Sequence, residues 1–263
     1  MKTTVFIFFI VLWMFAGLAA VSTASEADEA EIERYKKIIS ENPNDAAARN
    51  SLGLIYKKLK RYNEALAEFK EVKRLDPNYP DVRVNLGAVY IKLGQHPTGK
   101  REYQEALKIN PKDPKAHHAV AAFYYMLQRY PVSLPKFQEV ARLTPNDPKA
   151  HYNLGLNYNK LKKYEDAIAS FKEALRLDPG YAGAYLMLGS VYNSLKDGRN
   201  AVIHTLKAGK LYEKQNNEKG KARSERNLEK LLEKYELKRE DFEDVKSSSP
   251  PQQPVSSSTG EVP

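Results

Sequence analysis

The side chains that could do chemistry in this chain are few and far apart. His117 and His151 are separated by 34 residues, with His118 beside the first, and imidazole is a common zinc ligand. A zinc site needs three or four ligands, however, and no carboxylate recurs with the same spacing to complete one. We therefore expect these histidines to pack against neighbouring helices, and we expect no metal site.

Signatures of catalysis are also missing from the sequence. It contains no glycine-rich phosphate loop and no nucleophile elbow that would place a serine beside a histidine and an aspartate. It contains no cysteine, which excludes disulfides, thiolate metal ligands and a cysteine nucleophile. These features favour a protein that is not an enzyme and that uses no cofactor.

A strict 34-residue period organises the chain. Gly53, Gly87, Gly155 and Gly189 lie on it, and Ala121 takes the remaining place. A tyrosine follows each place by three residues and a proline follows the first four by twenty-four: Tyr56, Tyr90, Tyr124, Tyr158 and Tyr192, then Pro77, Pro111, Pro145 and Pro179. Such a period predicts that one supersecondary unit is repeated along the chain.

Each period contains two amphipathic helices. In the first, Leu52, Tyr56 and Leu59 have helical i, i+4, i+7 spacing, and a second helical pattern begins at Ala65. A glycine or alanine on the period allows the two helices to approach closely, because a larger side chain would push them apart. The prolines end the second helix, since proline cannot extend it and restricts the residue before it.

A 34-residue unit with Leu-Gly-x-x-Tyr, then Ala-x-x-x-Phe, then Pro resembles the tetratricopeptide repeat (TPR) family. The resemblance covers roughly residues 30 to 215 and implies an all-α, right-handed α-solenoid of helix-turn-helix repeats. The expected segments are an N-terminal signal peptide or anchor at 1–24, an acidic half repeat at 25–45, TPR units at 46–79, 80–113, 114–147, 148–181 and 182–215, a capping helix at 216–246 and a disordered tail at 247–263.

The N-terminal segment is typical of a secretory signal. Lys2 precedes an apolar run over residues 5–18, and Ser22-Thr23-Ala24 offers small residues for cleavage. The run is shorter than the roughly 20 residues that span a bilayer, although an uncleaved anchor remains an alternative. We expect an exported protein, periplasmic or secreted from a bacterium, or else one anchored by its N-terminus and facing outward.

The C-terminal third adds two further segments. Residues 218–235 form an amphipathic helix with one narrow apolar stripe, as expected of a cap on the last repeat, although a partner or self-association helix is the alternative. Phe242 and Val245 extend the pattern by one turn. The tail is rich in Ser, Pro and Gln and cannot build a core, so it is either a solvated spacer or a proline-rich ligand.

Charge is unevenly distributed. Residues 25–45 carry a net charge of −4, whereas residues 46–246 carry +13. Lysines spread over helices without aromatic stacking platforms or a known motif do not indicate nucleic-acid binding, and export also argues against it. The basic body favours acidic protein segments, and membrane contact is expected only if the N-terminal segment stays uncleaved.

The TPR resemblance implies that the first helix of each unit lines a concave groove. Asn85 and Asn153 occupy the place where relatives hold a peptide backbone, and an amide can both donate and accept. The other groove positions predicted to bind peptide are Lys115, His118, Tyr125, Lys149, Tyr152 and Asn159. The lysine and asparagine clamp for a terminal carboxylate is incomplete, because Asn50 and Leu54 replace two of its residues.

The third unit is unusual because Pro131 and Pro135 fall early in its second helix. Pro131 suits a first turn, but Pro135 removes an internal N–H donor. We expect that helix to start late or to kink, which would widen the groove beside Tyr125.

The function most consistent with these features is a non-catalytic protein-interaction scaffold. It would bind extended or helical segments with acidic and hydrophobic residues, and would assist assembly or localisation of an exported complex. The alternative is a regulatory or substrate-recruiting subunit of an envelope enzyme that handles polysaccharide or cell wall. Self-association through the ends of the solenoid is also possible.

Overall fold

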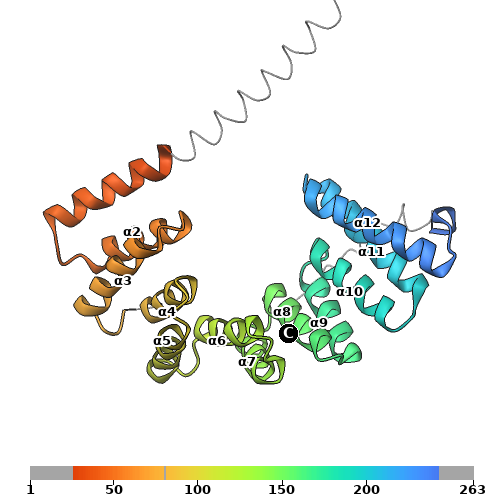
Figure 1. Ribbon diagram of the computed structural model, residues 1–263, viewed down its shortest axis with the longest axis horizontal. Coiled ribbons are helices and arrows are strands. Elements are labelled where there is room, and N and C mark those ends of the chain that lie inside the picture. Colours follow the sequence, from red (N-terminus) through yellow and green to blue (C-terminus); the bar gives the residue numbers. More distant parts are fainter. Residues whose placement is uncertain (1–25, 80, 243–263) are drawn as a thin grey trace, which may run out of the picture. The chain divides into compact units, whose positions relative to one another are not determined.

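The computed structural model describes residues 26–79 and 81–242, and this part of the chain is all-α, without a strand (Figure 1). A helix over residues 26–41 comes first. Helix pairs follow, and their bounds are α2 Ala46–Lys58, α3 Tyr62–Leu75, α4 Val82–Lys92, α5 His96–Ile109, α6 Pro114–Met126, α7 Tyr130–Leu143, α8 Pro148–Lys160, α9 Tyr164–Leu177, α10 Ala182–Ser194, α11 Gly198–Lys214 and α12 Glu218–Tyr235, then a 3-10 turn, η1, Arg239–Phe242. The expected fold class is confirmed.

Polar caps and prolines set the helix ends. The carboxylate of Asp45 accepts a hydrogen bond from the Ala48 amide at the start of α2, and Asp147 does the same for Lys149 at the start of α8. At the other ends, α3 and α9 stop at Asp76 and Asp178, which are extended because a proline follows each of them. Local sequence therefore determines where each helix begins and ends.

The glycines on the period lie where paired helices touch. A Cβ atom added to Gly53 would come within 2.7 Å of the Phe69 ring, and one added to Gly155 would come within 2.7 Å of the Phe171 ring. Phe69 and Phe171 are fully buried, so neither ring has room to move away. The close approach that the small residues predict is confirmed at both pairs.

The backbone conformation also repeats with the 34-residue period. One residue in the turn between paired helices has a left-handed backbone in all five repeats, with positive φ at Lys60, Gly94, Gln128, Lys162 and Lys196. Only the second unit uses glycine, for which this conformation carries no penalty from a Cβ atom. The five turns therefore have the same backbone conformation although the residues at this position differ.

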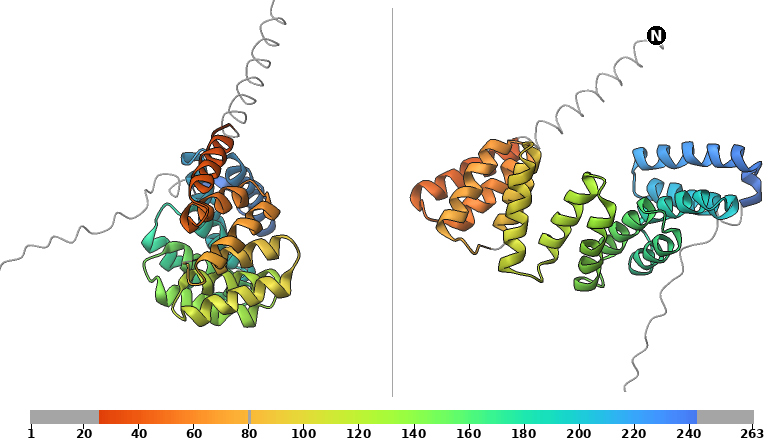
Figure 2. Two further views of the ribbon diagram at one scale, coloured as in Figure 1. Left: turned by 90° about the vertical axis from the view of Figure 1, so that its left-hand side faces the viewer. Right: turned by 60° about the horizontal axis from the view of Figure 1, so that its bottom comes forward.

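Contacts divide the chain into two units, Met1–Ala119 and Val120–Pro263, and each is described by itself. The core of unit 1 is formed by Ile32, Leu52, Phe69, Val82 and Leu86 with their neighbours. In unit 2, α8 packs against α9 and α10 packs against α11, so that each pair forms a helical hairpin (Figure 2). Ile32 belongs to the helix over 26–41, so that helix is part of the first core.

Helix α12 packs on α11 at the end of unit 2. Leu228 and Leu231 are buried with Val202, Leu206 and Phe242. The Tyr235 hydroxyl donates to the Asn193 carbonyl over 3.1 Å, so α12 is also fastened to α10. Covering the last repeat in this way keeps its apolar face from water.

The expected late start of the second helix in the third unit is wrong. Helix α7 begins at Tyr130, the same repeat position at which α3 and α9 begin. Pro131 lies in the first turn, where the amide has no intrahelical acceptor, so it costs no hydrogen bond. Pro135 is accommodated inside the helix. Val245, which the sequence analysis assigns to a final C-terminal turn, lies outside the described residues.

Over residues 26–79 and 81–242, no helix combines the length and the apolar character needed to cross a bilayer.

Candidate functional site

A hollow of ≈ 670 Å³ opens on the first helices of unit 1. Asn50 and Leu54 of α2, Val84 and Asn85 of α4, and Lys115 of α6 line it, together with Tyr79 and Asp81 from the loop before α4. The first five belong to the positions that the TPR resemblance places in a groove. The structure thus brings Asn85 and Lys115, two predicted site residues, to one surface.

A half-buried lysine lies next to this hollow, bonded to Asn85 in its wall. Lys57 donates from Nζ to Asn85 Oδ1 over 2.6 Å, and its ammonium lies 5.9 Å from the centre of the Phe69 ring. Burial lowers the pKa of Lys57 below its usual value, and the charge of Asp81 opposes that effect only in part. A second carboxylate at this point would stabilise the charged ammonium.

Asn50 contributes an acceptor to the same wall. Its Oδ1 atom is buried and accepts no hydrogen bond from the described residues. A buried acceptor without a donor carries a desolvation penalty of about 1–3 kcal/mol. The hollow therefore has a cation without a full counter-charge beside it and an acceptor without a donor in its wall.

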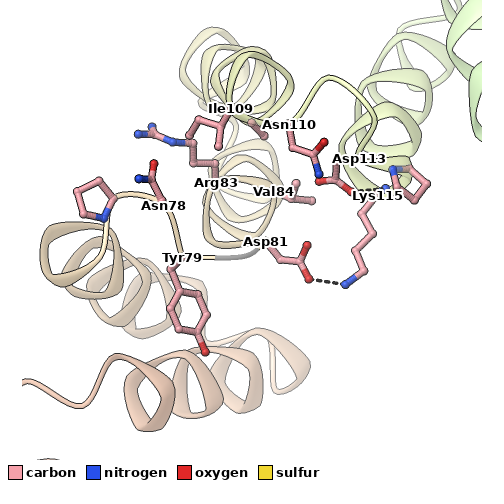
Figure 3. A pocket seen from close by; sticks show the side chains of 12 residues that line it. Asn78, Tyr79, Asp81, Arg83, Val84, Ile109, Asn110, Asp113 and Lys115 are labelled. Atoms are coloured by element: carbon pink, nitrogen blue, oxygen red, sulfur yellow. Dashed lines mark hydrogen bonds and ion pairs between the residues drawn. The ribbon is translucent and has the colours of Figure 1, made fainter.

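An ion pair crosses the rim of the hollow. Lys115 Nζ contacts Asp81 Oδ2, which lies 34 residues earlier (Figure 3). This hydrogen bond, together with the Asp81 charge, raises the pKa of Lys115. Asp81 is the residue before α4, yet its side chain caps no amide and its φ is 63°, a strained value for a residue with a Cβ atom. The pair therefore links the second and third repeats at the site.

A smaller hollow of ≈ 310 Å³ adjoins the first. The two share Tyr79, Asp81, Val84 and Lys115 in their walls, and Ile109 reaches the smaller one from the end of α5 (Figure 3). Ile109 is 49% exposed, whereas the residues at the same repeat position in other units are partly buried leucines. This edge of unit 1 thus has room for an apolar side chain.

Aromatic residues make up the corresponding surface in unit 2. Tyr125 lies edge-on to Tyr130 with ring centres 5.2 Å apart, and Tyr152 lies 4.8 Å from Tyr181. Burial raises the pKa of Tyr125, with smaller contributions from Tyr130 and Tyr152, so the predicted site residues Tyr125 and Tyr152 are neighbours. Burial is also the main reason that the pKa of Tyr181 rises to about 12.

The remaining predicted site residues lie on α6 and α8. Asn153 and Asn159 are half-buried on α8, and Lys149 is exposed near the start of the same helix. His118 is half-buried on the unit 1 part of α6.

His117 and His151 play a packing role, as the sequence indicates. Each ring Nε2 lies 2.9 Å from a proline carbonyl oxygen in the preceding loop, Pro111 for His117 and Pro145 for His151. The two histidines thereby fasten equivalent loops in consecutive repeats. In the described part of the chain, no group of three His, Cys, Asp or Glu residues could hold a metal ion.

Sequence reasoning missed Tyr79 and Asp81 as lining residues. The available signal was the residue order, because aspartate precedes proline where the third and fourth units begin, whereas Asp81 follows Pro80. This shift places Asp81 just before α4, two positions later in the repeat than Asp113 and Asp147.

Comparison with protein families gives a consistent result. Four models described as tetratricopeptide repeat or TPR repeat match residues 35–67, 53–94, 84–148 and 148–181. No functionally curated protein matches the chain.

Solved structures show the same fold. MamA from Desulfovibrio magneticus RS-1, residues 41 to the end, is 25% identical, with a TM-score of 0.58, and the match covers 65% of this chain and 96% of that chain. MamA AMB-1 is 26% identical, with a TM-score of 0.53 and coverage of 64% and 92%. YrrB is 20% identical, with a TM-score of 0.55 and coverage of 74% and 99%.

The period, the paired helices and the four family matches agree along the described chain. It belongs to the tetratricopeptide repeat family.

Proposed function

We propose that this protein is an interaction scaffold whose unit 1 hollow binds an extended partner segment containing an acidic residue next to an apolar one. The observation that carries the proposal is the half-buried Lys57, whose ammonium has a neutral amide as its hydrogen-bond acceptor. TPR solenoids present extended binding surfaces of this kind. YrrB, which shares the fold, is described as a TPR protein with an unusual peptide-binding site.

The residues in and beside the hollow determine which chemical groups the bound partner segment needs. A carboxylate would pair with Lys57 and would compete with Asp81 for Lys115. The side-chain amides of Asn50 and Asn85, which line the hollow, can each donate from Nδ2 to a backbone carbonyl. Leu54, which is 38% exposed, and Val84 offer apolar contact beside these groups.

The aromatic surface of unit 2 is proposed to bind apolar side chains of a partner through Tyr125 and Tyr152. Asn153, Asn159, Lys149 and His118 are proposed to contribute polar contacts, as the TPR resemblance implies. We also propose that the scaffold is exported and serves an exported or envelope complex, and the support for this is the N-terminal sequence over residues 1–24.

A peptide-library selection tests the hollow. A random twelve-residue library displayed on phage is selected on the full chain, and the enriched peptides are titrated by calorimetry. We expect enrichment of Asp or Glu next to an apolar residue. Lys57→Met, which keeps the stem over Phe69 but removes the charge, should weaken binding by about tenfold, the cost of losing one charge-assisted hydrogen bond.

Asn50→Ala and Asn85→Ala should also weaken the selected peptides, whereas Asn63→Ala on the exposed surface of α3 is the matched control. Peptides without acidic residues, or peptides that bind Lys57→Met as tightly as the native chain, would show that the hollow is not the binding site.

A further inference from the structure

The turn between α6 and α7 exposes apolar side chains, at two of its positions where other repeats carry polar ones. Met126, Leu127 and Val132 are 51%, 39% and 46% exposed, and they lie within seven residues. Three other repeats have lysine at the position of Met126, namely Lys58, Lys92 and Lys160. All four other repeats have a polar residue at the position of Val132. The described sequence thus departs from its own period toward exposed apolar side chains, which are normally costly.

The surrounding structure holds this turn in place. Tyr130 packs edge-on against Tyr125, and Pro131 stiffens the first turn of α7. Ser133 is completely buried and accepts a hydrogen bond from the Nδ2 atom of the equally buried Asn157 of α8. Val132 is therefore anchored by its neighbour and cannot turn inward without breaking a buried polar contact.

Lysines lie beside the apolar side chains. Lys160 is one helical turn beyond Asn157, which contacts Ser133, so the α8–α9 turn is next to the α6–α7 turn. Lys160, Lys162 and Lys163 of that turn are exposed, and so is Arg129 between Leu127 and Val132. Glu165 and Asp166, at the start of α9, are also exposed, so the cations outnumber the carboxylates there by four to two. The result is an apolar tip with a cationic rim.

We propose that this tip, Met126, Leu127 and Val132 with its rim of Arg129, Lys160, Lys162 and Lys163, inserts into the surface of an anionic lipid bilayer. Three side chains on a turn are too few for a specific protein interface, which buries about 800 Å² on each partner. Lysine is depleted at protein interfaces, but next to a bilayer it buries its stem, leaves its ammonium among the headgroups and gains from their negative charge. The contact is separate from the unit 1 hollow and independent of residues 1–24.

A tryptophan reporter gives a residue-specific test in the full chain. Trp13 is the single tryptophan of the sequence, so Trp13→Phe with Val132→Trp leaves one reporter at the tip. In vesicles of phosphatidylcholine with about 30% phosphatidylglycerol, its emission should shift to the blue and be quenched by brominated lipid. The shift should be weaker in pure phosphatidylcholine and should fall with added salt, because the anionic headgroups attract the rim.

Two matched controls make the outcome decisive. The same reporter at the exposed position 169 of α9, Ala169→Trp, should stay unshifted. Adding Met126→Lys and Arg129→Glu to the tip reporter should reduce the partition coefficient about tenfold or more, because apolar area and a cation are lost. If the tip reporter stays unshifted while the chain sediments with vesicles, the N-terminal segment alone holds it and the proposal is overturned.

Two other outcomes also overturn the proposal. Equal insertion of the reporter with and without Met126→Lys and Arg129→Glu would mean that the introduced tryptophan drives the effect. The tip would instead be a protein interface if two results came together. The emission of the reporter would not change with vesicles, and a protein that crosslinks to the native chain would no longer crosslink to the Met126→Lys, Val132→Asn variant. Melting curves of that last variant should match the native chain, because it carries residues used at the same positions in other repeats.

Discussion

His204 is the histidine that the protein environment perturbs most strongly. Its ring is stacked on Tyr192 at 5.2 Å and on Tyr185 at 6.0 Å, and its Nδ1 atom is buried without a partner among the described residues. Burial, assisted by the charges of Lys207 and Lys172 and opposed by Asp197, lowers its pKa from 6.5 to about 4. The folded protein therefore resists protonation of a side chain that the unfolded chain protonates readily.

This difference predicts a pH-dependent stability. Between pH 6.5 and about 4 the unfolded state binds a proton that the native state does not, so stability falls as the pH is lowered through this window. The full effect is on the order of 3 kcal/mol, and it stops growing below the folded pKa. Urea unfolding at several pH values should show a shallower loss for His204→Phe than for the native chain. Parallel curves would contradict the assignment.

Other residue-scale features show what spacing can reveal. The packing role of His117 and His151 could be predicted because both occupy one repeat position and no carboxylate recurs with them. The pairing of Asp81 with Lys115 could not, because it depends on the left-handed backbone at Asp81. A residue whose φ departs from its local preference moves its side chain to a place that the repeat pattern does not show.

At the scale of the element, the hairpin turns impose strain on the residue that joins each pair of helices. Lys162 has a φ of 58° and Gly94 has a φ of 77° at equivalent positions. A Cβ atom added at Gly94 would meet nothing within 4 Å, so any effect of a substitution there arises from the backbone alone.

We predict opposite effects at these two turns. Lys162→Gly should stabilise unit 2, and Gly94→Ala should destabilise unit 1, each by about 1 kcal/mol, because the left-handed conformation penalises a Cβ atom. The entropy of glycine in the unfolded chain opposes both effects and makes each of them smaller than the backbone term alone. Thermal melts of the two variants measure both signs, and a destabilising Lys162→Gly would show that the lysine stem makes a contact that outweighs the strain.

Helix α7 shows how an element can depart from an expectation based on proline. The start at Tyr130 is set by the turn geometry that all repeats share, including the left-handed Gln128, and not by the prolines that follow. Pro131 fits because first-turn amides have no helical acceptor. The sequence therefore showed where the unusual repeat lies but not where its helix begins.

At the scale of the whole molecule, a repeat protein is held by contacts between neighbours in sequence. Unit 1 has its own core around Phe69, and the end of unit 2 has another around Leu228, Val202 and Phe242. A defect at one end should therefore propagate only through adjacent repeats.

Leu228→Ala tests this locality. Leu228 is 1% exposed, so removing its side chain should cost about 2–5 kcal/mol and loosen α12 from α11. Hydrogen exchange followed by mass spectrometry should speed up in α11 and α12 and remain unchanged in α2 to α5. Uniformly faster exchange along the chain would mean that the two units unfold as one cooperative body.

The sequence by itself determined the repeat, the family, the all-α fold and the close approach of paired helices. These follow from short-range rules, since helical spacing, a small residue facing Phe69 or Phe171 and a proline stop each depend on a few neighbouring residues. It also placed Asn85 and Lys115 on one surface, because each falls on the groove-facing side of the first helix of its repeat.

Only the tertiary structure decided how these side chains are used. Lys57 donates to Asn85 and Lys115 pairs with Asp81 across 28 and 34 residues of chain. Which polar atom is satisfied, which cation is poorly hydrated and which apolar tip stays exposed depend on contacts between repeats and on single backbone angles. The 34-residue period repeats the helices but not these contacts, because each pairing needs two particular side chains in adjacent repeats.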